Sequence, residues 1–248
     1  VPISKEALDL GFNVLCEKPL ARRAKDVDML IATAKKRKKV LAVYQQSRFA
    51  PYYEQVKKVI ASGVLGRVVM VKIAFNGFGR RWDWQTLQEF SGGSLLNTGP
   101  HPLDQALEFV GRDRMPQVFC IMDRVNTFGD AEDHVKLILR SKGRPTVDLE
   151  ISACAPYTGF TYQLYAQYGG LTGTTASIQW KYYRPEEAPK QRLTRTPLPG
   201  RKYCGETLAW HEESWEQPKD TDLFMVMSKK LYGSLYARLT RGAPLVVT

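Results

Sequence analysis

Cysteine is scarce in this sequence, and its four cysteines are far apart: Cys16, Cys120, Cys154 and Cys204. Because no Cys-x-x-Cys pair occurs, neither a thiolate zinc site nor a disulfide framework is indicated. We therefore expect no metal site, and thiols that stay reduced, as is usual for a cytoplasmic protein.

Long apolar runs are also missing. No stretch of the chain approaches the roughly 18 apolar residues that are typical of a membrane-spanning helix. The first residues, VPISKEALDLG, are amphipathic and lack the apolar segment of a signal peptide. The sequence therefore predicts no membrane partner.

Negative charge is in deficit, since 25 acidic residues stand against 36 basic ones and the net charge is +11. Such a balance suits nucleic acid, an anionic membrane or an anionic small molecule. The densest basic run, residues 35–39, lies at the end of a predicted helix, where cations complement the helix dipole. No zinc-finger spacing or RNA-binding aromatic motif accompanies it, so we expect no nucleic-acid partner.

The glycine-rich turn that normally follows the first strand of a dinucleotide-binding fold, G-x-G-x-x-G, does not occur. The first residues nevertheless alternate helix and strand, an order that implies a parallel sheet. The expected elements are a helix at 3–10, a strand at 12–16, a helix at 24–37 and a strand at 40–44. Residues 1–45 are thus predicted to be the C-terminal remnant of a dinucleotide-binding Rossmann domain, truncated before Val1.

The remaining residues, 46–248, have another pattern. Apolar and polar residues alternate in HVKLILR, TVDLEISAC and FTYQLYAQYG, which is typical of antiparallel strands with one face in water. Further expected elements are a strand at 68–75, a helix over 93–110, a surface excursion at 184–219 and a helix over about 220–239. The predicted fold class is an α/β remnant followed by an α+β domain with a large open antiparallel sheet, which binds substrate and oligomerises.

Glu17-Lys18-Pro19 ends the first predicted strand. Open α/β sheets bind ligands at the carboxyl ends of their strands, where Lys18 would lie. Proline stiffens the turn that aims the lysine, because its φ angle is fixed and it has no N–H donor. Glu17 is free to pair with a cation or to accept from a ligand hydroxyl. The alternative is a surface turn with solvated charges.

A second motif is GGSLLNTGPHPLD, residues 92–104. Asn97 and His101 are four residues apart and share one face of a helix, and Asp104 lies roughly on the same side. Histidine titrates near neutral pH and suits proton transfer. The prolines on either side of His101 should kink or restart the helix there. The alternative is a core histidine at a helix kink, and we expect structural roles for His134 and His211.

Together the two motifs resemble those of the Gfo/Idh/MocA oxidoreductases, which include glucose–fructose oxidoreductase and inositol dehydrogenase. LGFNVLCEKPLA and GGSLLNTGPHPLD match the family's two motifs, and the RFAP segment at 48–51 is similar to its RFxP segment. The resemblance implies an NAD- or NADP-dependent oxidoreductase whose small-molecule substrate is a sugar, a polyol or a related hydroxy compound. In this chain, cofactor binding is expected to be weak or absent and the chain alone inactive.

The resemblance also implies roles for individual residues. The predicted catalytic residues are Lys18, which binds the reacting hydroxyl, His101, which exchanges its proton, and Asn97, which replaces the family's usual aspartate. The predicted cofactor-binding residues are Glu17, Lys18 and Pro19. The predicted substrate-binding residues are Arg48, Trp84, Asn97 and Asp104, since Trp stacks on sugar rings and Arg binds hydroxyls or carboxylates.

Two other functions of the same fold stay open: a non-catalytic sensor or interaction protein for sugars or dinucleotides, and a cofactor-dependent glycosidase. The resemblance further implies a homodimer or homotetramer joined through the sheet. Its open face is expected to expose Tyr162, Tyr165 and Tyr168, because aromatic residues suit interfaces better than water.

Overall fold

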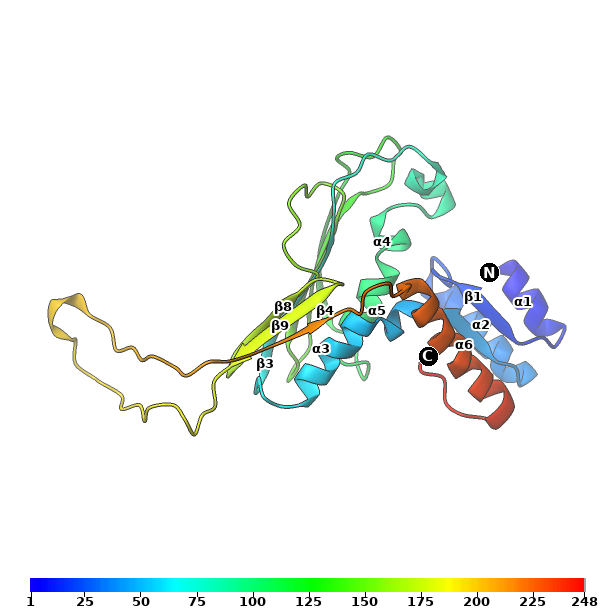
Figure 1. Ribbon diagram of the computed structural model, residues 1–248. Helices are drawn as coiled ribbons and strands as arrows, with labels where there is room; N and C mark the ends of the chain where they lie inside the picture. Colours follow the sequence, from blue (N-terminus) through cyan, green and yellow to red (C-terminus); the bar gives the residue numbers. More distant parts are fainter. Residues whose placement is uncertain (248) are drawn as a thin grey trace.

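The computed structural model describes residues 1–247 in two parts (Figure 1). Residue 248, the last of the predicted second domain, lies outside the described residues. The first part consists of α1 (Pro2–Asp9), β1 (Val14–Glu17), α2 (Ala24–Arg37) and β2 (Leu41–Tyr44). The strands β1 and β2 pair in parallel, with Glu17 opposite Tyr44. The carboxyl ends of both strands therefore meet at one edge of this small sheet.

The second part begins with η1 (Gln46–Phe49), a short 3₁₀ helix. Its helices and helical turns are α3 (Pro51–Ala61), η2 (Trp84–Thr86), η3 (Gln88–Phe90), α4 (Ser94–Asn97), α5 (Pro100–Val110), η4 (Pro199–Arg201) and α6 (Leu223–Arg241). Its strands are β3 (Val68–Asn76), β4 (Gln117–Asp123), β5 (His134–Arg140), β6 (Thr146–Ser152), β7 (Tyr162–Ala166), β8 (Gly169–Gly173), β9 (Ser177–Tyr182) and β10 (His211–Glu216).

The eight strands of the second part form one sheet in the order β10-β9-β8-β7-β3-β6-β5-β4. Neighbouring strands run antiparallel except β3 and β6, which run parallel. The parallel pair arises because α4, α5, β4 and β5 all intervene between β3 and β6 along the chain. The predicted fold class is confirmed, with a sheet that is mixed at this one pairing.

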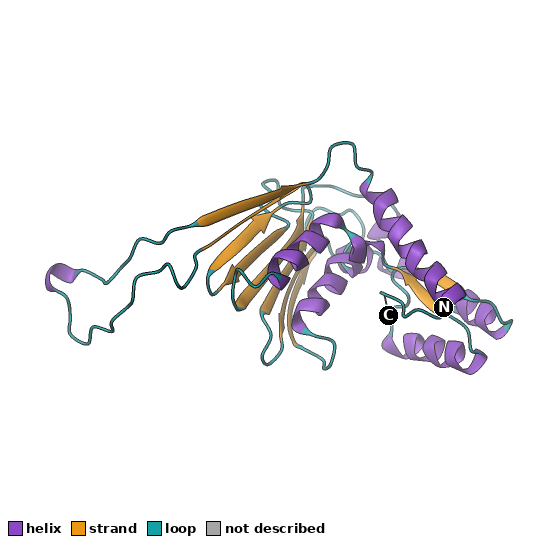
Figure 2. Ribbon diagram, turned by 60° about the horizontal axis from the view of Figure 1, so that its bottom comes forward, coloured by secondary structure: helices purple, strands orange, loops and turns teal. Residues whose placement is uncertain are grey.

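One face of the sheet is covered by α3 and α5, and the other face is open (Figure 2). Residues of β3 and β7 that point toward the helices are buried, among them Val71, Ile73 and Leu164. This alternation is the one that the sequence pattern predicts for a sheet with one wet face. The core of the second part therefore lies between the sheet and its two helices.

The prediction that Tyr162 lies on the open face is wrong. Tyr162 is fully buried under α3, and its ring lies 6.1 Å from that of Tyr52 and 6.3 Å from that of Tyr53, measured between ring centroids. Successive strand residues alternate between faces, so Tyr162 and Tyr165, three positions apart, point to opposite sides. Tyr165 is 45% exposed, and Tyr168 is half-buried beside Tyr183.

The helix predicted over 93–110 is two helices, because the chain restarts at Gly99-Pro100. A side chain at Gly99 would place its Cβ 2.3 Å from the carbonyl oxygen of Leu95, so only glycine allows this close turn. Pro100 then occupies the first turn of α5, where no N–H donor is needed. The two prolines therefore begin a helix rather than kink one.

The predicted surface excursion at 184–219 also contains β10, a strand that the sequence analysis missed. Its sequence, HEESWE, lacks the apolar alternation of a typical strand, and in the structure only His211 and Trp215 are half-buried. Residues 184–210 form a long arm that projects away from both parts (Figures 1 and 2). Among the described residues, no helix is long and apolar enough to cross a bilayer.

Strand β3 supplies a test of this core. We expect Val71→Ala to lower the free energy of unfolding by about 2 kcal/mol, because each buried carbon is worth about 0.8 kcal/mol and a cavity adds to the loss. Val69→Ala removes the same atoms two residues away, at an irregularity in the strand, where the side chain is 46% exposed. Its effect should stay within about 0.5 kcal/mol in urea denaturation. Equal losses for the two variants would contradict the assignment of the faces.

Candidate active site

Lys18 follows the last residue of β1 and reaches from the first part to the second. Its Nζ donates a hydrogen bond to the carbonyl oxygen of Asn97 at 2.6 Å, across 79 positions of sequence. Burial lowers the pKa of Lys18, and the neighbouring Glu17 opposes that shift. The two predicted motifs are thus in contact, through a lysine side chain and a backbone carbonyl.

His101 lies in the first turn of α5, one turn beyond Asn97. Its Nδ1 is 2.9 Å from Oε1 of Gln45 and 3.1 Å from Oγ of Ser47. Both partners are almost fully buried and come from the segment that links β2 to α3. Because β1 and β2 end at the same edge, this segment approaches His101 from the same side as Lys18.

The hydrogen bonds of Gln45 determine which nitrogen of His101 carries the proton. The Nε2 of Gln45 donates to the carbonyl oxygen of Pro100, which can only accept. The Oε1 of the same amide must then be the acceptor for the Nδ1–H of His101. In the neutral imidazole this leaves Nε2 of His101 unprotonated and able to accept a proton.

The surroundings of His101 also keep it neutral. Burial, and after it the positive charge of Lys18, lower its pKa from 6.5 to about 4, while Asp104 acts in the opposite direction. An imidazole of this kind is unprotonated at neutral pH. Next to it stands an ammonium group that donates hydrogen bonds. The pair can therefore accept a proton from a hydroxyl and stabilise negative charge on its oxygen.

Asn97 contributes its backbone more clearly than its side chain. The carbonyl oxygen holds Lys18, and the side-chain Nδ2 lies 3.4 Å from Oε1 of Gln85 in η2. Gln85 also accepts a hydrogen bond from Arg81. Asn97 thus connects the lysine to the loop that carries Trp84.

Trp84 and Glu17 are the sequence neighbours of Gln85 and Lys18, the two residues whose side chains hydrogen-bond Asn97. Trp84 is 61% exposed and makes an edge-to-face contact with Phe90. Glu17 is exposed at the end of β1, and Pro19 is half-buried. A hollow of about 560 Å³ lies beside Glu17, lined also by Tyr44 and Gln46 and, from α6, by Phe224, Met225, Ser228 and Tyr232.

Arg48 and Asp104, both predicted to bind substrate, bind each other. Arg48 is only 3% exposed, and its guanidinium meets Asp104 through two hydrogen bonds, of which Nε–Oδ2 measures 2.6 Å. Glu108 accepts a further bond at 3.0 Å. Burial by itself lowers the pKa of Arg48, but the bonds to Asp104 raise it above its ordinary value. Their substrate-binding role stays a prediction, and these contacts favour fixing η1 against α5.

The sequence analysis missed Gln45, Ser47 and Gln105. Gln105 is fully buried, donates to the carbonyl oxygen of Ser47 at 2.8 Å and accepts from the hydroxyl of Tyr162. A usable signal was present: the polar residues QQS follow the strand LAVY directly, at the edge where ligands of α/β sheets bind. The sequence analysis assigned roles at that edge to Glu17, Lys18 and Pro19 and, in the segment that follows the second strand, to Arg48.

Comparisons with known proteins match both parts of the chain to one family. A family model described as "GFO/IDH/MocA C-terminal domain" matches residues 53–179, and one described as "Oxidoreductase family, NAD-binding Rossmann fold" matches residues 1–45. Trans-1,2-dihydrobenzene-1,2-diol dehydrogenase of Xenopus tropicalis is 31% identical over 137 residues, which are 55% of this chain and 41% of that protein.

D-glucoside 3-dehydrogenase of Escherichia coli is 36% identical over 108 residues, 42% of this chain and 31% of that protein. A solved structure of an Agrobacterium radiobacter oxidoreductase in complex with NAD+, L-tartaric acid and magnesium has a TM-score of 0.69 at 16% identity. It is matched over 99% of this chain and 68% of its own. The chain thus spans less than half the length of the two curated relatives.

The environment of His101 predicts its titration. We expect its imidazole to stay neutral until about pH 4 in an NMR titration of the folded chain. In Lys18→Met its pKa should rise, because the nearby positive charge is gone. Unfolded histidine binds its proton near pH 6.5, so this site should lower folding stability as the pH falls from about 6.5 to about 4. A midpoint near 6.5 in the folded chain would contradict this description.

The hydrogen bonds of Gln45 predict the tautomer. In the unaltered chain, ¹⁵N chemical shifts should show the proton of His101 on Nδ1. Gln45→Leu removes the acceptor and should shift the population toward the Nε2–H form, since Ser47 is able to donate as well as accept. Gln46→Leu makes the same change at the next residue, whose side chain has no hydrogen bond to the imidazole, and should leave the tautomer as it was. An unchanged tautomer in Gln45→Leu would refute the role of Gln45.

Proposed function

This chain belongs to the GFO/IDH/MocA oxidoreductase family, and from that premise we propose that it supplies the catalytic and substrate-binding part of an NAD- or NADP-dependent oxidoreductase. Its substrate would be a sugar, a polyol or a related hydroxy compound. The observation that carries the proposal is the convergence of Lys18 and a neutral His101 at the end of β1. Two relatives named as dehydrogenases of a diol and of a glucoside support a hydroxyl-bearing substrate.

The proposed chemistry assigns one task to each side chain. When bound, the nicotinamide supplies the hydride acceptor. The ammonium of Lys18 donates one N–H to the carbonyl oxygen of Asn97, and its other two N–H groups are available to the reacting hydroxyl oxygen. Nε2 of His101 takes the hydroxyl proton while the lysine stabilises the negative charge that develops on the oxygen. Gln45 and Ser47 hold the imidazole in the orientation and tautomer that leave Nε2 free.

The residues at the end of β1 fit one end of such a cofactor. Glu17 lines the hollow beside β1 and β2 and is free to accept from a ligand hydroxyl, and we propose Glu17, Lys18 and Pro19 as cofactor contacts. The sequence offers no glycine-rich turn for the phosphates. We therefore propose that this chain by itself binds the cofactor weakly or not at all and is inactive.

We also propose roles for the less direct residues. Trp84, exposed on the loop beside Asn97, would stack on the substrate, and Asn97 would hydrogen-bond it. Arg48 and Asp104 would position α5 through their ion pair rather than contact the substrate. We also propose that the domain boundary lies after residue 45. Helix α6 nevertheless packs against the first part, where the hydroxyls of Ser228 and Tyr44 form a hydrogen bond of 2.7 Å.

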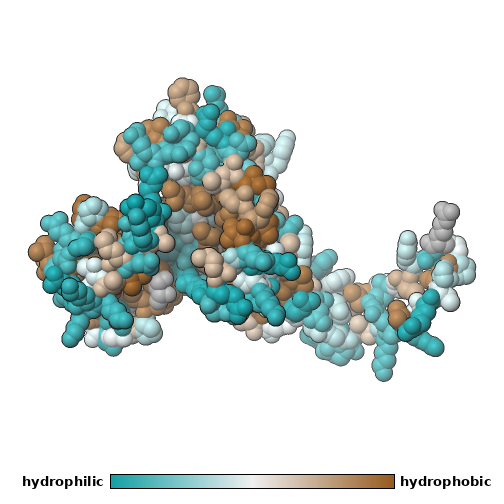
Figure 3. All heavy atoms as spheres, turned by 180° about the vertical axis from the view of Figure 1, so that it is seen from behind, coloured by the Kyte–Doolittle hydropathy of each residue, from teal (hydrophilic) through white to brown (hydrophobic). Residues whose placement is uncertain are grey.

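A homodimer or homotetramer through the open face of the sheet completes the proposal. The edge strand β4 exposes apolar side chains at Val118, Phe119, Ile121 and Met122, between 48% and 59% each. The view from behind (Figure 3) shows apolar side chains gathered at the middle of the molecule. An exposed apolar patch of this kind is typical of an interaction surface.

The polypeptide that carries the complete nucleotide-binding domain provides the test. In it, His101→Ala should lower kcat by roughly 10²–10⁴, the usual contribution of proton transfer by a side chain. Cofactor affinity should hardly change. The control is His134→Ala, since His134 lies on β5 and bonds Ser152 instead of the lysine site. Activity would be followed as NADH or NADPH formation with a panel of sugars and polyols.

Other outcomes would support a different proton carrier or a different function. Normal turnover in His101→Ala, with turnover abolished in Lys18→Met, would make the lysine the proton carrier. Ligand binding without turnover in the unaltered protein would favour a sensor. Release of aryl groups from aryl glycosides, without net cofactor reduction, would favour the glycosidase.

A further inference from the structure

The arm, residues 184–210, connects β9 to β10, and most of it does not pack against the rest of the described chain. It projects away from the sheet as two extended limbs with η4 at its tip (Figures 1 and 2). Among the described residues, its backbone beyond Ala188 makes no hydrogen bond to the body of the chain. The limbs touch through side chains, with Gln191 donating to Glu206 at 2.8 Å. Most of the arm's backbone groups are thus available to a partner.

The side chains of the arm have the features of a contact surface. Leu193 is 81% exposed and Tyr203 is 95% exposed, although large apolar side chains favour burial. Prolines restrict the limb that leaves β9 and the tip of the arm, whereas residues 202–210 of the returning limb contain none; the prolines are Pro185, Pro189, Pro197 and Pro199. Because proline limits the conformations of the free chain, an arm of this composition loses less entropy when it docks.

The outer part of the arm is also basic, whereas the arm's acidic residues, Glu186, Glu187 and Glu206, lie nearer the sheet. Five Lys or Arg residues and no acidic residue lie between Ala188 and Gly205; they are Lys190, Arg192, Arg195, Arg201 and Lys202. Lys190, Arg192 and Arg195 are exposed, and none of the three forms an ion pair with any described residue. The surface that receives the arm should therefore be acidic.

Strand β10 of the same chain presents such a surface on the open face of the sheet. Trp215 packs against the core and Glu213 bonds the buried Tyr182, so the alternate residues Glu212, Ser214 and Glu216 point to the other face. Glu212 and Glu216 are exposed, and neither forms an ion pair with the described residues. As an edge strand, β10 also has one side without a neighbouring strand.

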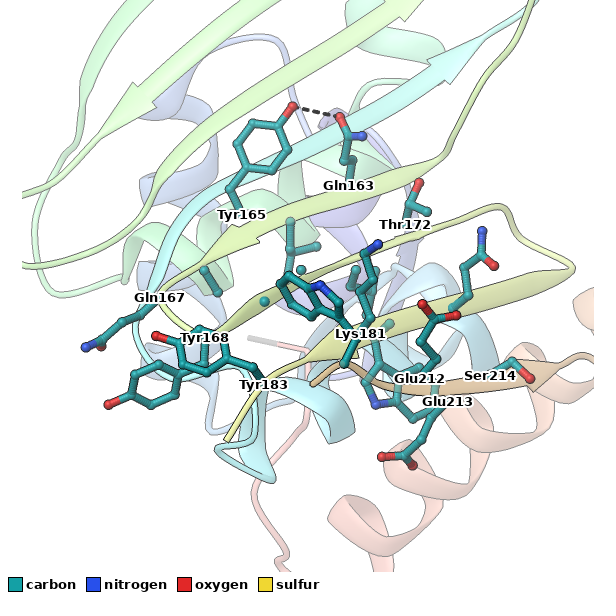
Figure 4. Close-up of a pocket in the computed structure, with 18 residues that line it drawn as sticks. Gln163, Tyr165, Gln167, Tyr168, Thr172, Lys181, Tyr183, Glu212, Glu213 and Ser214 are labelled. Carbon is teal, nitrogen blue, oxygen red and sulfur yellow. Dashed lines mark hydrogen bonds between the residues drawn. The ribbon is translucent and has the colours of Figure 1, made fainter. Parts of the chain in front are cut away.

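Next to this acidic edge lies a hollow of about 830 Å³. Tyr165, Tyr183 and Trp210 line it together with Glu212 and Ser214 (Figure 4). Tyr165 and Trp210 are each nearly half exposed. The hollow thus offers aromatic surface for apolar side chains beside the carboxylate of Glu212, and Lys181, the partner of Glu212 on the neighbouring strand, also lines it.

We propose that the arm docks on a second copy of this chain, with Arg192 and Arg195 against Glu212 and Glu216 of that copy and with Leu193 and Tyr203 on its aromatic hollow. The arm leads away from its own sheet, so its own β10 is not its target (Figure 1). One chain carries both complementary surfaces, and a two-fold axis therefore forms the contact twice. This inference rests on the oligomer proposed above and names the segment that holds it together.

Sedimentation velocity at micromolar concentration tests the docking. The double variant Arg192→Glu and Arg195→Glu should weaken self-association by on the order of tenfold or more, because like charges then oppose each other. Glu212→Arg with Glu216→Arg should weaken it to a similar extent. All four changes in one chain should restore association, since every arm again meets the opposite charge. The matched control is Arg22→Glu with Lys25→Glu, which makes the same charge change on the exposed start of α2.

The outcomes separate this inference from the function proposed above. A monomeric unaltered chain would overturn both the arm contact and the sheet-mediated oligomer, and would leave the chemistry of Lys18 and His101 standing. Association that both reversals leave unchanged, or that the fourfold variant does not restore, would overturn the arm contact alone. Binding of a single-stranded oligonucleotide that the arm reversal abolishes, with unchanged self-association, would assign the arm to an anionic partner and also overturn the proposal.

Discussion

One hydrogen bond, from Nζ of Lys18 to the carbonyl oxygen of Asn97, holds the two parts of the site together. It brings a positive charge from the end of β1 to the turn that precedes α5. That charge, together with burial, keeps His101 neutral. Without the contact, the lysine would be a solvated residue at a strand end and the histidine an ordinary buried imidazole. The chemistry proposed for the chain depends on their being neighbours.

The neighbouring polar groups explain how a buried site of this kind is stabilised. Gln45, Ser47 and Gln105 form a connected set of hydrogen bonds that ends at the carbonyl oxygens of Pro100 and Ser47. Buried polar groups without partners are costly, whereas satisfied networks make a structure rigid. Arg48 joins the same region to Asp104 and Glu108. Helix α5, which carries His101, is thus fixed from one side by η1 and from the other by the sheet.

Local sequence signals predicted the fold and the two motifs, but tertiary packing decided the rest. The alternation in β5, β6 and β7 predicted a sheet with one wet face. The same alternation puts Tyr162 on the buried face, opposite the exposed Tyr165, which the sequence analysis overlooked. Strand β10 has no apolar alternation and is held by pairing with β9, so its sequence alone could not reveal it. Lys18, Asn97 and His101 were recognised from their motifs. Gln45 was missed because its importance comes from a contact across 56 positions of sequence.

The most direct test of the central claim is the pH dependence of kcat/KM in the polypeptide with the complete nucleotide-binding domain. This profile reports the pKa of the essential base in the free enzyme. If a neutral His101 beside Lys18 accepts the proton, the acid side of the profile should fall only near pH 4, where that imidazole takes up its proton. A fall centred near pH 6.5, the value of an ordinary histidine, would contradict the account.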